Sequence, residues 1–479
     1  VAKGDGIGPE IMDAVLKIFD AQGVGLEYAF VDMGKWVFDK GFSNGMTPEA
    51  QAAIEELGIL FKGPMETPKG KGVKSVNVTA RKTWNTYANK RVFKTLHGVD
   101  TVFSKAGIPI DLTIVRENIE DTYGGIEHML THDVALSRRF ITRPGSMQVI
   151  RYAFEMARQE GAKRITCGHK ANIMKLTDGL FLECFYEVAK EYPELQADDK
   201  IVDDLAMKLV VRPDEFDVVV LTNLQGDIIS DLCAGLVGGL GFAPSANIGD
   251  YISIFEAVHG TAPDIAGKNI ANPTALLLSG LSMLRHLGYM ENAAIIENAL
   301  LYTLEQGVRT GDFGDRSKPA LNTTQFSEAI IANFGKQPEV GAKPAGTNVP
   351  NSAAVCHLEK NLMMVSKEEE EEKISGADFF IESIEQPGTI ADKCMRHGGT
   401  KFKLISISNR GTQVWPTGSK YTNLVNQYNL RFEGLPEQPL TQQDIIGLYV
   451  TLSADFKVCS LELLNMWGEK RAYSLAQGQ

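Results

Sequence analysis

The chain has 479 residues, of which 44% are hydrophobic and 23% charged, a composition typical of a globular protein with two or three domains. Its formal net charge of −12 argues against a general affinity for nucleic acids or anionic membranes. No apolar stretch approaches the roughly 18 residues needed to cross a membrane, and the six cysteines show no CxxC spacing, so we expect free thiols in a reducing compartment.

The first element is predicted at residues 1–22, where a strand end, a glycine turn and a helix with Pro9 in its first turn follow one another. The glycines there run GxGxG and not GxGxxG, so a Rossmann phosphate loop is not supported. Helical patterns then alternate with short apolar strands to about residue 335, which indicates an α/β architecture with a largely parallel sheet. The strands are expected at Ile59–Lys62, Ile114–Arg116, Arg164–Gly168, Leu209–Arg212 and Phe216–Leu221.

Three arginines, Arg81, Arg91 and Arg116, fall at the ends of predicted elements, and Ser75 and Asn77 lie close to the first of them. Guanidinium groups bind carboxylates in a bidentate manner, and hydroxyl or amide groups can hold the remaining oxygens. The cluster therefore suits a substrate with several carboxylates, although for any one arginine alone an ordinary surface residue is the better interpretation.

Further along the chain, Tyr123 and Lys170 are residues whose pKa can be tuned for acid–base chemistry. His259 and Gly260 begin a turn, closed by Pro263, whose backbone amides could approach a nucleotide. Taken singly, each of these residues also fits a purely structural role.

Two aspartates four residues apart, Asp227 and Asp231, follow the expected strand Phe216–Leu221. A helix that opens after Gly226 places both carboxylates on one face, one turn apart. Such carboxylates repel each other unless a hard dication neutralises them, and Mg²⁺ or Mn²⁺ takes oxygen ligands of this kind. The spacing alone leaves a second interpretation open, an acidic first turn that complements the helix dipole.

A change of composition follows residue 335. Residues 336–375 are predicted to be a linker, because they are rich in Pro, Gly, Lys and Asn and end in a run of glutamates. Residues 376–479 are predicted to form a small α/β domain without catalytic residues, used for oligomerisation. Its expected elements are a strand at Ala377–Glu382, a helix at Thr389–His397, a hairpin of Phe402–Ser408 and Thr412–Trp415, and helices near 422–432 and 441–455.

In their order along the chain, these motifs resemble those of the β-decarboxylating dehydrogenases, the family of isocitrate and isopropylmalate dehydrogenases. The resemblance covers residues 1–335 and implies a bilobal α/β fold that is not Rossmann, with a large lobe (1–86 and 238–335) and a small lobe (87–237). It implies an interlocking arm at about 121–142 and a homodimer, or a higher oligomer, whose active sites lie between the lobes and borrow residues from the partner. Residues 376–479, notably Ser406–Thr412, resemble the additional C-terminal domain of some bacterial isocitrate dehydrogenases.

The resemblance also implies a role for each matching residue. Substrate carboxylates would be bound by Arg81, Arg91 and Arg116, with Ser75, Asn77 and Asn172 beside them. Asp227 and Asp231 of one subunit, with Asp203 of the other, would bind Mg²⁺ or Mn²⁺. Tyr123 and the partner's Lys170 would be the acid–base pair. The cofactor would be bound by Thr67, Glu256, His259, Gly260, Thr261, Ala262, Asp264, Ile265 and Asn272.

Two positions bear on substrate and cofactor. The hydroxyl of Ser75 and the amide of Asn77 match a third carboxylate and not an isopropyl group, so we expect isocitrate, with the longer homoisocitrate as the competitor. Asp264 and Ile265 stand where NADP-using members carry a cation and an aromatic residue. Because a carboxylate accepts the ribose hydroxyls of NAD and repels a 2′-phosphate, we expect NAD.

The predicted activity is the oxidative decarboxylation of isocitrate to 2-oxoglutarate, as in the tricarboxylic acid cycle. One alternative is a non-catalytic regulatory subunit, but such subunits have lost members of the Arg–Asp–Lys–Tyr set that is complete here. Another is a metal-dependent hydrolase, which leaves the arginines unexplained. The cysteine pattern leads us to expect the cytoplasm. The sequence starts at Val1 without a methionine, so an organelle matrix is the alternative if a targeting peptide has been removed.

Overall fold

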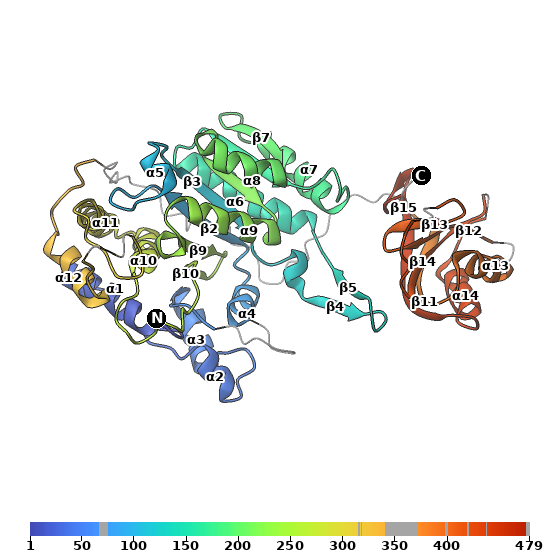
Figure 1. Ribbon diagram of the computed structural model, residues 1–479, viewed down its shortest axis with the longest axis horizontal. Helices are drawn as coiled ribbons and strands as arrows, with labels where there is room; N and C mark the ends of the chain where they lie inside the picture. The colour runs from blue at the N-terminus through green and yellow to red at the C-terminus, as the bar shows by residue number, and fades with distance from the viewer. Residues whose placement is uncertain are drawn as a thin grey trace. The chain divides into compact units, whose positions relative to one another are not determined.

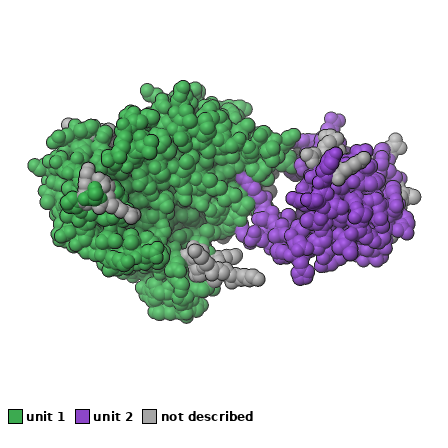
Figure 2. Space-filling model, in the orientation of Figure 1, with its two compact units in different colours: residues 1–123, 140–363 green, residues 124–139, 364–479 purple. Residues whose placement is uncertain are grey.

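A computed structural model describes residues 1–66, 75–314, 317, 319–340, 371–397, 401–418, 421–436 and 438–475. The chain divides into two compact units, Val1–Tyr123 with Phe140–Met363, and Gly124–Arg139 with Met364–Gln479 (Figure 2). The predicted site residue Thr67 and most of the predicted linker lie outside the described residues.

The first unit is built on an eight-stranded sheet among the described residues (Figure 1). The sheet is mixed and not largely parallel as predicted, because the four central strands from β10 to β3 pair antiparallel. Parallel pairs occur at both edges. In spatial order the strands are β1 (Ile59–Phe61), β10 (Ser253–Ala257), β9 (Pro244–Ile248), β2 (Ala88–Lys94), β3 (Asp111–Glu117), β8 (Val218–Leu221), β6 (Arg164–His169) and β7 (Gln196–Ile201).

Helices cover both faces of this sheet, and alternation along the strands explains why. In β8, Val218 and Val220 pack into one apolar core, whereas Val219 and Leu221 pack into the core on the opposite face. The first of these cores is completed by α6 (Arg143–Gln159) and α7 (Thr177–Ala189), and the second by α8 (Val202–Val211) and α9 (Asn223–Leu236).

The other end of the sheet is enclosed in the same manner. Phe61 and Phe255 face a core formed with α1, α10, α11 and α12, while Leu60 and Ile254 face α3 and α4. Helix α1 begins at Gly8, with Pro9 in its first turn as predicted, and ends before Gly23, whose φ of 75° suits glycine. These elements are α1 (Gly8–Gln22), α2 (Lys35–Asp39), α3 (Pro48–Leu57), α4 (Val76–Thr83), α5 (Val102–Lys105), α10 (Thr274–His286), α11 (Met290–Glu305), α12 (Thr323–Ala332) and the short helices η1 (Asp121–Gly124), η2 (Pro213–Glu215) and η3 (Leu240–Phe242).

The second unit contains an antiparallel sheet with two helices on one face. Its elements are β11 (Glu372–Glu382), α13 (Pro387–His397), β12 (Phe402–Asn409), β13 (Thr412–Trp415), β14 (Gln427–Gly434), α14 (Gln442–Leu452), β15 (Lys457–Trp467) and β16 (Lys470–Arg471). The unit also includes the hairpin of β4 (Ile126–Met129) and β5 (Ala135–Arg138), which lies within the predicted arm. Thr131 Oγ1 in the hairpin turn donates to Asn426 Oδ1 at 2.9 Å, and Arg138 Nη2 pairs with Glu462 Oε1 at 2.6 Å.

Two predicted elements are wrong. Leu209–Arg212 was expected to be a strand but lies at the end of α8, where Leu205 and Leu209 form one buried helical face. The helix expected near 422–432 is the strand β14, in which Tyr428, Leu430 and Phe432 point alternately into the core. The strands expected at Ile59, Ile114, Arg164 and Phe216 are confirmed within a few residues.

The five described cysteines are free, as predicted. Among the described helices, none combines the length and apolar character that a membrane crossing requires.

Candidate functional site

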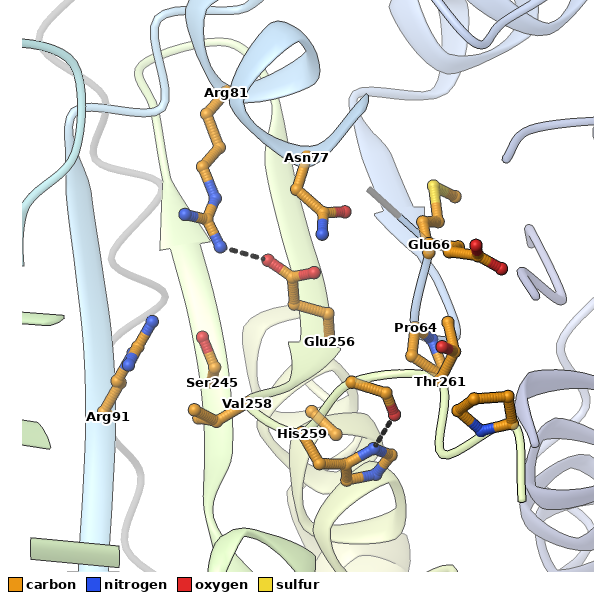
Figure 3. A pocket seen from close by; sticks show the side chains of 14 residues that line it. Pro64, Glu66, Asn77, Arg81, Arg91, Ser245, Glu256, Val258, His259 and Thr261 are labelled. Atoms are coloured by element: carbon orange, nitrogen blue, oxygen red, sulfur yellow. Dashed lines mark hydrogen bonds and ion pairs between the residues drawn. The ribbon is translucent and has the colours of Figure 1, made fainter. Parts of the chain in front are cut away.

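A cavity of about 710 Å³ opens beside the central strands of the first unit (Figure 3). Predicted substrate and cofactor residues that lie up to 184 positions apart in the sequence, from Asn77 to Thr261, line it together. Its lining residues are Pro64, Met65, Glu66, Asn77, Arg81, Arg91, Ser245, Glu256, Ala257, Val258, His259, Gly260, Thr261 and Pro263.

Asp227 is the centre of an adjoining charged cluster. Its Oδ1 accepts hydrogen bonds from Arg116 Nη1 and, at 3.3 Å, from Arg91 Nη2. Its Oδ2 accepts the hydroxyl of Tyr123 at 2.6 Å. Arg91 comes from β2, Arg116 from β3 and Asp227 from α9, so the neighbouring positions of these elements bring together residues that the sequence only suggested as a group.

Buried polar side chains hold the two arginines in place. Arg91 donates to Asn89 Oδ1 at 2.6 Å and to Ser230 Oγ at 2.5 Å, and Arg116 Nη2 donates to Asn223 Oδ1 at 2.7 Å. Helix α9 can approach Arg116 this closely because it carries Gly226, where an added Cβ would lie 2.7 Å from Arg116 Cγ. Both guanidinium groups are therefore fixed before a ligand arrives.

The cluster has a defined charge pattern. Burial, reinforced by the positive charge of Arg116, lowers the pKa of Arg91 to about 10. Burial alone would raise the pKa of Asp227, but the charges of Arg116 and Arg91 outweigh it and hold that pKa below its usual value. Burial raises the pKa of Tyr123 and also that of Asp231. Tyr123 is thus a protonated donor hydrogen-bonded to an ionised carboxylate.

The donor set fits part of a dication site. Asp227 and Asp231 lie one turn apart on α9, with side chains 36% and 61% exposed, so both carboxylates are accessible from solvent. Oxygen donors on a partly open site suit Mg²⁺ or Mn²⁺, which retain water and substrate ligands. Within the described ranges, no three His, Cys, Asp or Glu side chains are grouped so as to hold a metal ion. The third protein ligand predicted for this site, Asp203, lies elsewhere in the same chain.

Asp203 is paired with Lys170. Lys170 Nζ contacts Asp203 Oδ1, and this hydrogen bond is the leading cause of a lowered pKa at Asp203. Asn172 is exposed in the turn that follows Lys170. Among the described residues, neither Lys170 nor Asp203 forms a side-chain hydrogen bond or an ion pair with Asp227.

Glu256, which was predicted to bind the cofactor, is surrounded by polar and cationic side chains of its own chain. Its carboxylate is buried and contacts Lys62 Nζ, Arg81 Nη2 at 2.9 Å and Asn247 Nδ2 at 2.8 Å. Burial would raise the pKa of Glu256, but the charges of Lys62 and Arg81 outweigh it and lower that pKa well below its usual range. Beside this group, Asn77 Oδ1 and Arg81 Nε are buried without a hydrogen-bond partner among the described residues.

The loop that begins at His259 borders the same cavity. His259 Nδ1 lies 3.0 Å from the carbonyl of Gly260, whereas Nε2 is buried and has no partner among the described residues. Burial lowers the pKa of His259 and so favours the neutral ring. The loop is fixed at Thr261, whose carbonyl accepts the amide of Ile7 at 2.9 Å, and at Ala262, which adopts a φ of 40°.

The remaining predicted cofactor residues divide into two groups. Asp264 is exposed and Ile265 half-buried, so both can meet a ligand at the surface of the loop. The side chain of Asn272 is instead occupied internally, because its Oδ1 accepts from Thr274 and its Nδ2 donates to the carbonyl of Gly241. Ser75 immediately precedes α4, at the edge of the described residues.

Sequence reasoning missed several residues of the site. Lys62 and Asn247 surround Glu256, and Asn89 and Ser230 hold Arg91. Asp121, buried with a φ of 68°, accepts the amide of Leu224 in the first turn of α9. Its position two residues before Tyr123 was the one signal available in the sequence.

Comparisons with known proteins show which proteins this chain resembles. The sequence profile of the isocitrate/isopropylmalate dehydrogenase family matches residues 1–330, and that of the bacterial isocitrate dehydrogenase C-terminal domain matches residues 372–479. The chain is 44% identical to the isocitrate dehydrogenase [NADP] of Thermus thermophilus, over 100% of this chain and 95% of that one. It is 48% identical to the mitochondrial isocitrate dehydrogenase [NAD] catalytic subunit 5 of Arabidopsis thaliana, over 68% of this chain and 86% of that one. The crystal structure of the TT0538 protein from Thermus thermophilus superimposes with a TM-score of 0.92 at 43% identity, covering 100% of this chain and 95% of the other.

Proposed function

Because the chain belongs to the isocitrate/isopropylmalate dehydrogenase family, we propose that it is a divalent-cation-dependent isocitrate dehydrogenase that uses NAD. The reaction is the oxidation and decarboxylation of isocitrate to 2-oxoglutarate and CO₂. The observation that carries this proposal is the convergence of Arg91, Arg116 and Tyr123 on Asp227, beside a cavity lined by Arg81 and Asn77.

The chemistry divides among these residues. Arg81, Arg91 and Arg116 bind the substrate carboxylates, and Asn77, with its unsatisfied Oδ1, lies where it can meet the cofactor or substrate. Asp227 and Asp231, with the partner's Asp203, would hold a dication, which would supply the polarisation of the substrate hydroxyl and the neighbouring carboxylate. A base beside the partner's Lys170 takes the hydroxyl proton, and a bound nicotinamide cofactor would accept the hydride from the same carbon.

The last step depends on Tyr123. After CO₂ has left with its bonding electrons remaining on the substrate, the resulting enolate needs a proton at carbon. Tyr123 is protonated and hydrogen-bonded to Asp227, and Arg116 lies 4.8 Å from its ring, so the developing phenolate meets a positive charge. Tyr123→Phe should therefore retain hydride transfer while losing the final protonation.

The main test of the activity is a steady-state assay that crosses isocitrate, homoisocitrate and isopropylmalate with NAD and NADP, with and without EDTA. We expect turnover of isocitrate that EDTA abolishes and Mn²⁺ restores. Full activity after exhaustive chelation would exclude the proposed metal site. A higher kcat/KM for homoisocitrate would move the assignment to that substrate.

NAD is proposed on the basis of Asp264, an exposed carboxylate in the loop that begins at His259. The relative that spans the whole chain is called an NADP enzyme and the shorter one an NAD enzyme, so the ratio of the two kcat/KM values decides the question. Asp264→Asn should raise the NADP value relative to NAD because it removes the repulsion of the 2′-phosphate. A wild-type preference for NADP would overturn the proposal.

The shared active site can be tested by complementation between inactive protomers. A heterodimer of one Lys170→Met protomer and one Asp227→Asn protomer should have one intact site and about half of the wild-type activity. A heterodimer of wild type with a protomer that carries both substitutions should have none. If each chain used only its own residues, the two results would be exchanged.

A further inference from the structure

A buried carboxylate that does not line the candidate site connects two segments that carry predicted site residues. Asp178, in the first turn of α7, is fully buried. Its Oδ2 accepts the backbone amide of Lys170 at 2.6 Å and the side-chain amide of Gln225 at 2.8 Å. One oxygen atom thus joins the loop that carries Lys170 to the helix that carries Asp227.

We propose that Asp178 is a positioning residue that couples the two active sites of the dimer. This inference rests on the proposed function, in which Lys170 serves the partner's site while Asp227 serves the site of its own chain. Gln225 lies two residues before Asp227 in α9, so a shift of Asp178 displaces residues that belong to two different sites.

The local structure makes this connection stiff. The loop after Lys170 is closed by hydrogen bonds from Ile173 and Met174 to the Lys170 carbonyl, at 3.0 and 2.9 Å, so Lys170 moves with the start of α7. Gln225 Oε1 is buried without a partner among the described residues, so Gln225 is oriented through its amino group alone. A buried anion that accepts two amide donors has one favourable position, and departure from it leaves polar groups unsatisfied.

The first test compares substitutions at both ends of the connection in the homodimer. Asp178→Ala should lower kcat by about 10- to 100-fold, because a shift of about 1 Å in a catalytic group has effects of that size. Asp178→Asn should retain most of the activity, because an amide oxygen in the place of Oδ2 accepts both donors. Equal losses in the two variants would overturn the positioning role.

Gln225→Met removes the donor at the other end without disturbing α7. We expect a several-fold loss of kcat in wild type and no further loss in the Asp178→Ala background, since both changes break one connection. Additive losses would contradict the coupling.

A matched control lies at the opposite end of β6. Asp217 Oδ2 accepts the backbone amides of Lys163 and Arg164 at 2.8 and 2.9 Å, so Asp217→Asn and Asp217→Ala probe the same kind of bond away from the site. They should affect unfolding but leave kcat and KM within about twofold. A loss of kcat equal to that of Asp178→Ala would assign the effect to general destabilisation of β6.

The decisive test uses the heterodimer with one intact site, in which the Lys170→Met protomer supplies Asp227 and the Asp227→Asn protomer supplies Lys170. Asp178→Ala in the second protomer should lower kcat through Lys170. In the first protomer it should raise the KM for isocitrate and the Kd for Mn²⁺ through Gln225 and α9.

If Asp178→Ala impairs the intact site from either protomer, the coupling is supported. If it does so only in the protomer that supplies Lys170, the coupling is overturned. If the parent heterodimer is inactive, the shared-site proposal fails. The homodimer cycle of Asp178 and Gln225 then still decides whether the two residues act on catalysis as one unit.

Discussion

At the scale of single residues, the cavity is held together by buried charge pairs. Glu256 is 5% exposed and lies between Lys62, which is 1% exposed, and Arg81. A buried cluster of opposite charges contributes little net stability. Removing one member is costly, however, because it leaves the remaining charges buried without a counter-charge. Glu256 therefore keeps Arg81 extended into the cavity before the substrate arrives.

We predict that Glu256→Gln lowers the free energy of unfolding by about 3–5 kcal/mol, because it leaves Lys62 and Arg81 without a counter-charge. Urea denaturation measures this loss. Glu160→Gln is the control, since Glu160 is 40% exposed in its pair with Lys90 and an exposed pair contributes about 1 kcal/mol or less. Similar losses in both variants would contradict the proposed importance of burial.

Glu117, beside Arg116, makes stability depend on pH. Burial raises the pKa of Glu117 to about 7, although the amide of Ile119 donates to it at 2.7 Å. The folded state thus holds this proton more tightly than the unfolded state, whose pKa lies near 4.5. The resulting stabilisation is complete below about pH 4.5 and is lost as the pH rises through 7.

Glu117→Gln keeps a neutral side chain at every pH and should remove this loss. Between pH 5 and pH 8, the free energy of unfolding of the wild type should fall by about 2 kcal/mol relative to that of the variant. Chemical denaturation at several pH values measures the difference. Parallel pH curves for the two proteins would show that Glu117 does not ionise in this range.

At the scale of elements, patterns within one segment were predictable and pairings between distant segments were not. Four consecutive buried residues identified β8, and the helix that follows placed Asp227 and Asp231 one turn apart, although α9 begins at Asn223 and not after Gly226. Leu209–Arg212 was misassigned because its β-branched residues favour a strand locally. In the structure, Leu209 and Leu205 form one buried face, which stabilises a helix.

The same limit explains which site residues were missed. Arg81, Arg91 and Arg116 could be found from the sequence because each stands near the end of an element with polar neighbours. Lys62 is 194 positions from Glu256, and Asp178 is 47 positions from Gln225. Neither pairing can be predicted from one segment alone. The order of the strands in the sheet determines the first pair, and the packing of α7 on the following elements determines the second.

The hairpin of β4 and β5 gives a prediction about an element. Its strands are largely exposed, and Arg138 joins it to Glu462 of β15 through a pair whose side chains are 40% and 50% exposed. Arg138→Glu should weaken this contact by about 1 kcal/mol or less and speed amide exchange in residues 126–138. Combining it with Glu462→Arg should restore the slower exchange, and a failure to do so would show that the ion pair does not hold the hairpin.

At the scale of the whole molecule, the first unit presents an apolar surface on the two helices that carry Asp203 and Asp227. Helices α8 and α9 pack beside each other on one face of the sheet and also expose large apolar side chains. These are Met207, Val210, Val211, Leu224 and Ile228, with exposures of 51%, 41%, 59%, 38% and 61%. Exposed apolar groups concentrated on two adjacent helices indicate a surface for protein association.

We predict that α8 and α9 pack against the same helices of a second copy and that this contact brings the partner's Asp203 to Asp227. A two-fold contact repeats any substitution on both sides, so Val211→Glu should weaken the dimer by at least about 10-fold through unpaired buried charges. Sedimentation at micromolar concentration should then show monomers. Their specific activity should fall on dilution while their circular dichroism remains that of the folded protein.

Val102→Glu is the matched control, because Val102 in α5 is 81% exposed and lies outside this surface. It should leave both sedimentation and activity unchanged. A Val211→Glu protein that stays dimeric would place the interface elsewhere. A monomer with undiminished kcat would be the stronger contradiction, since the proposed site needs Asp227 of one chain and Lys170 and Asp203 of the other.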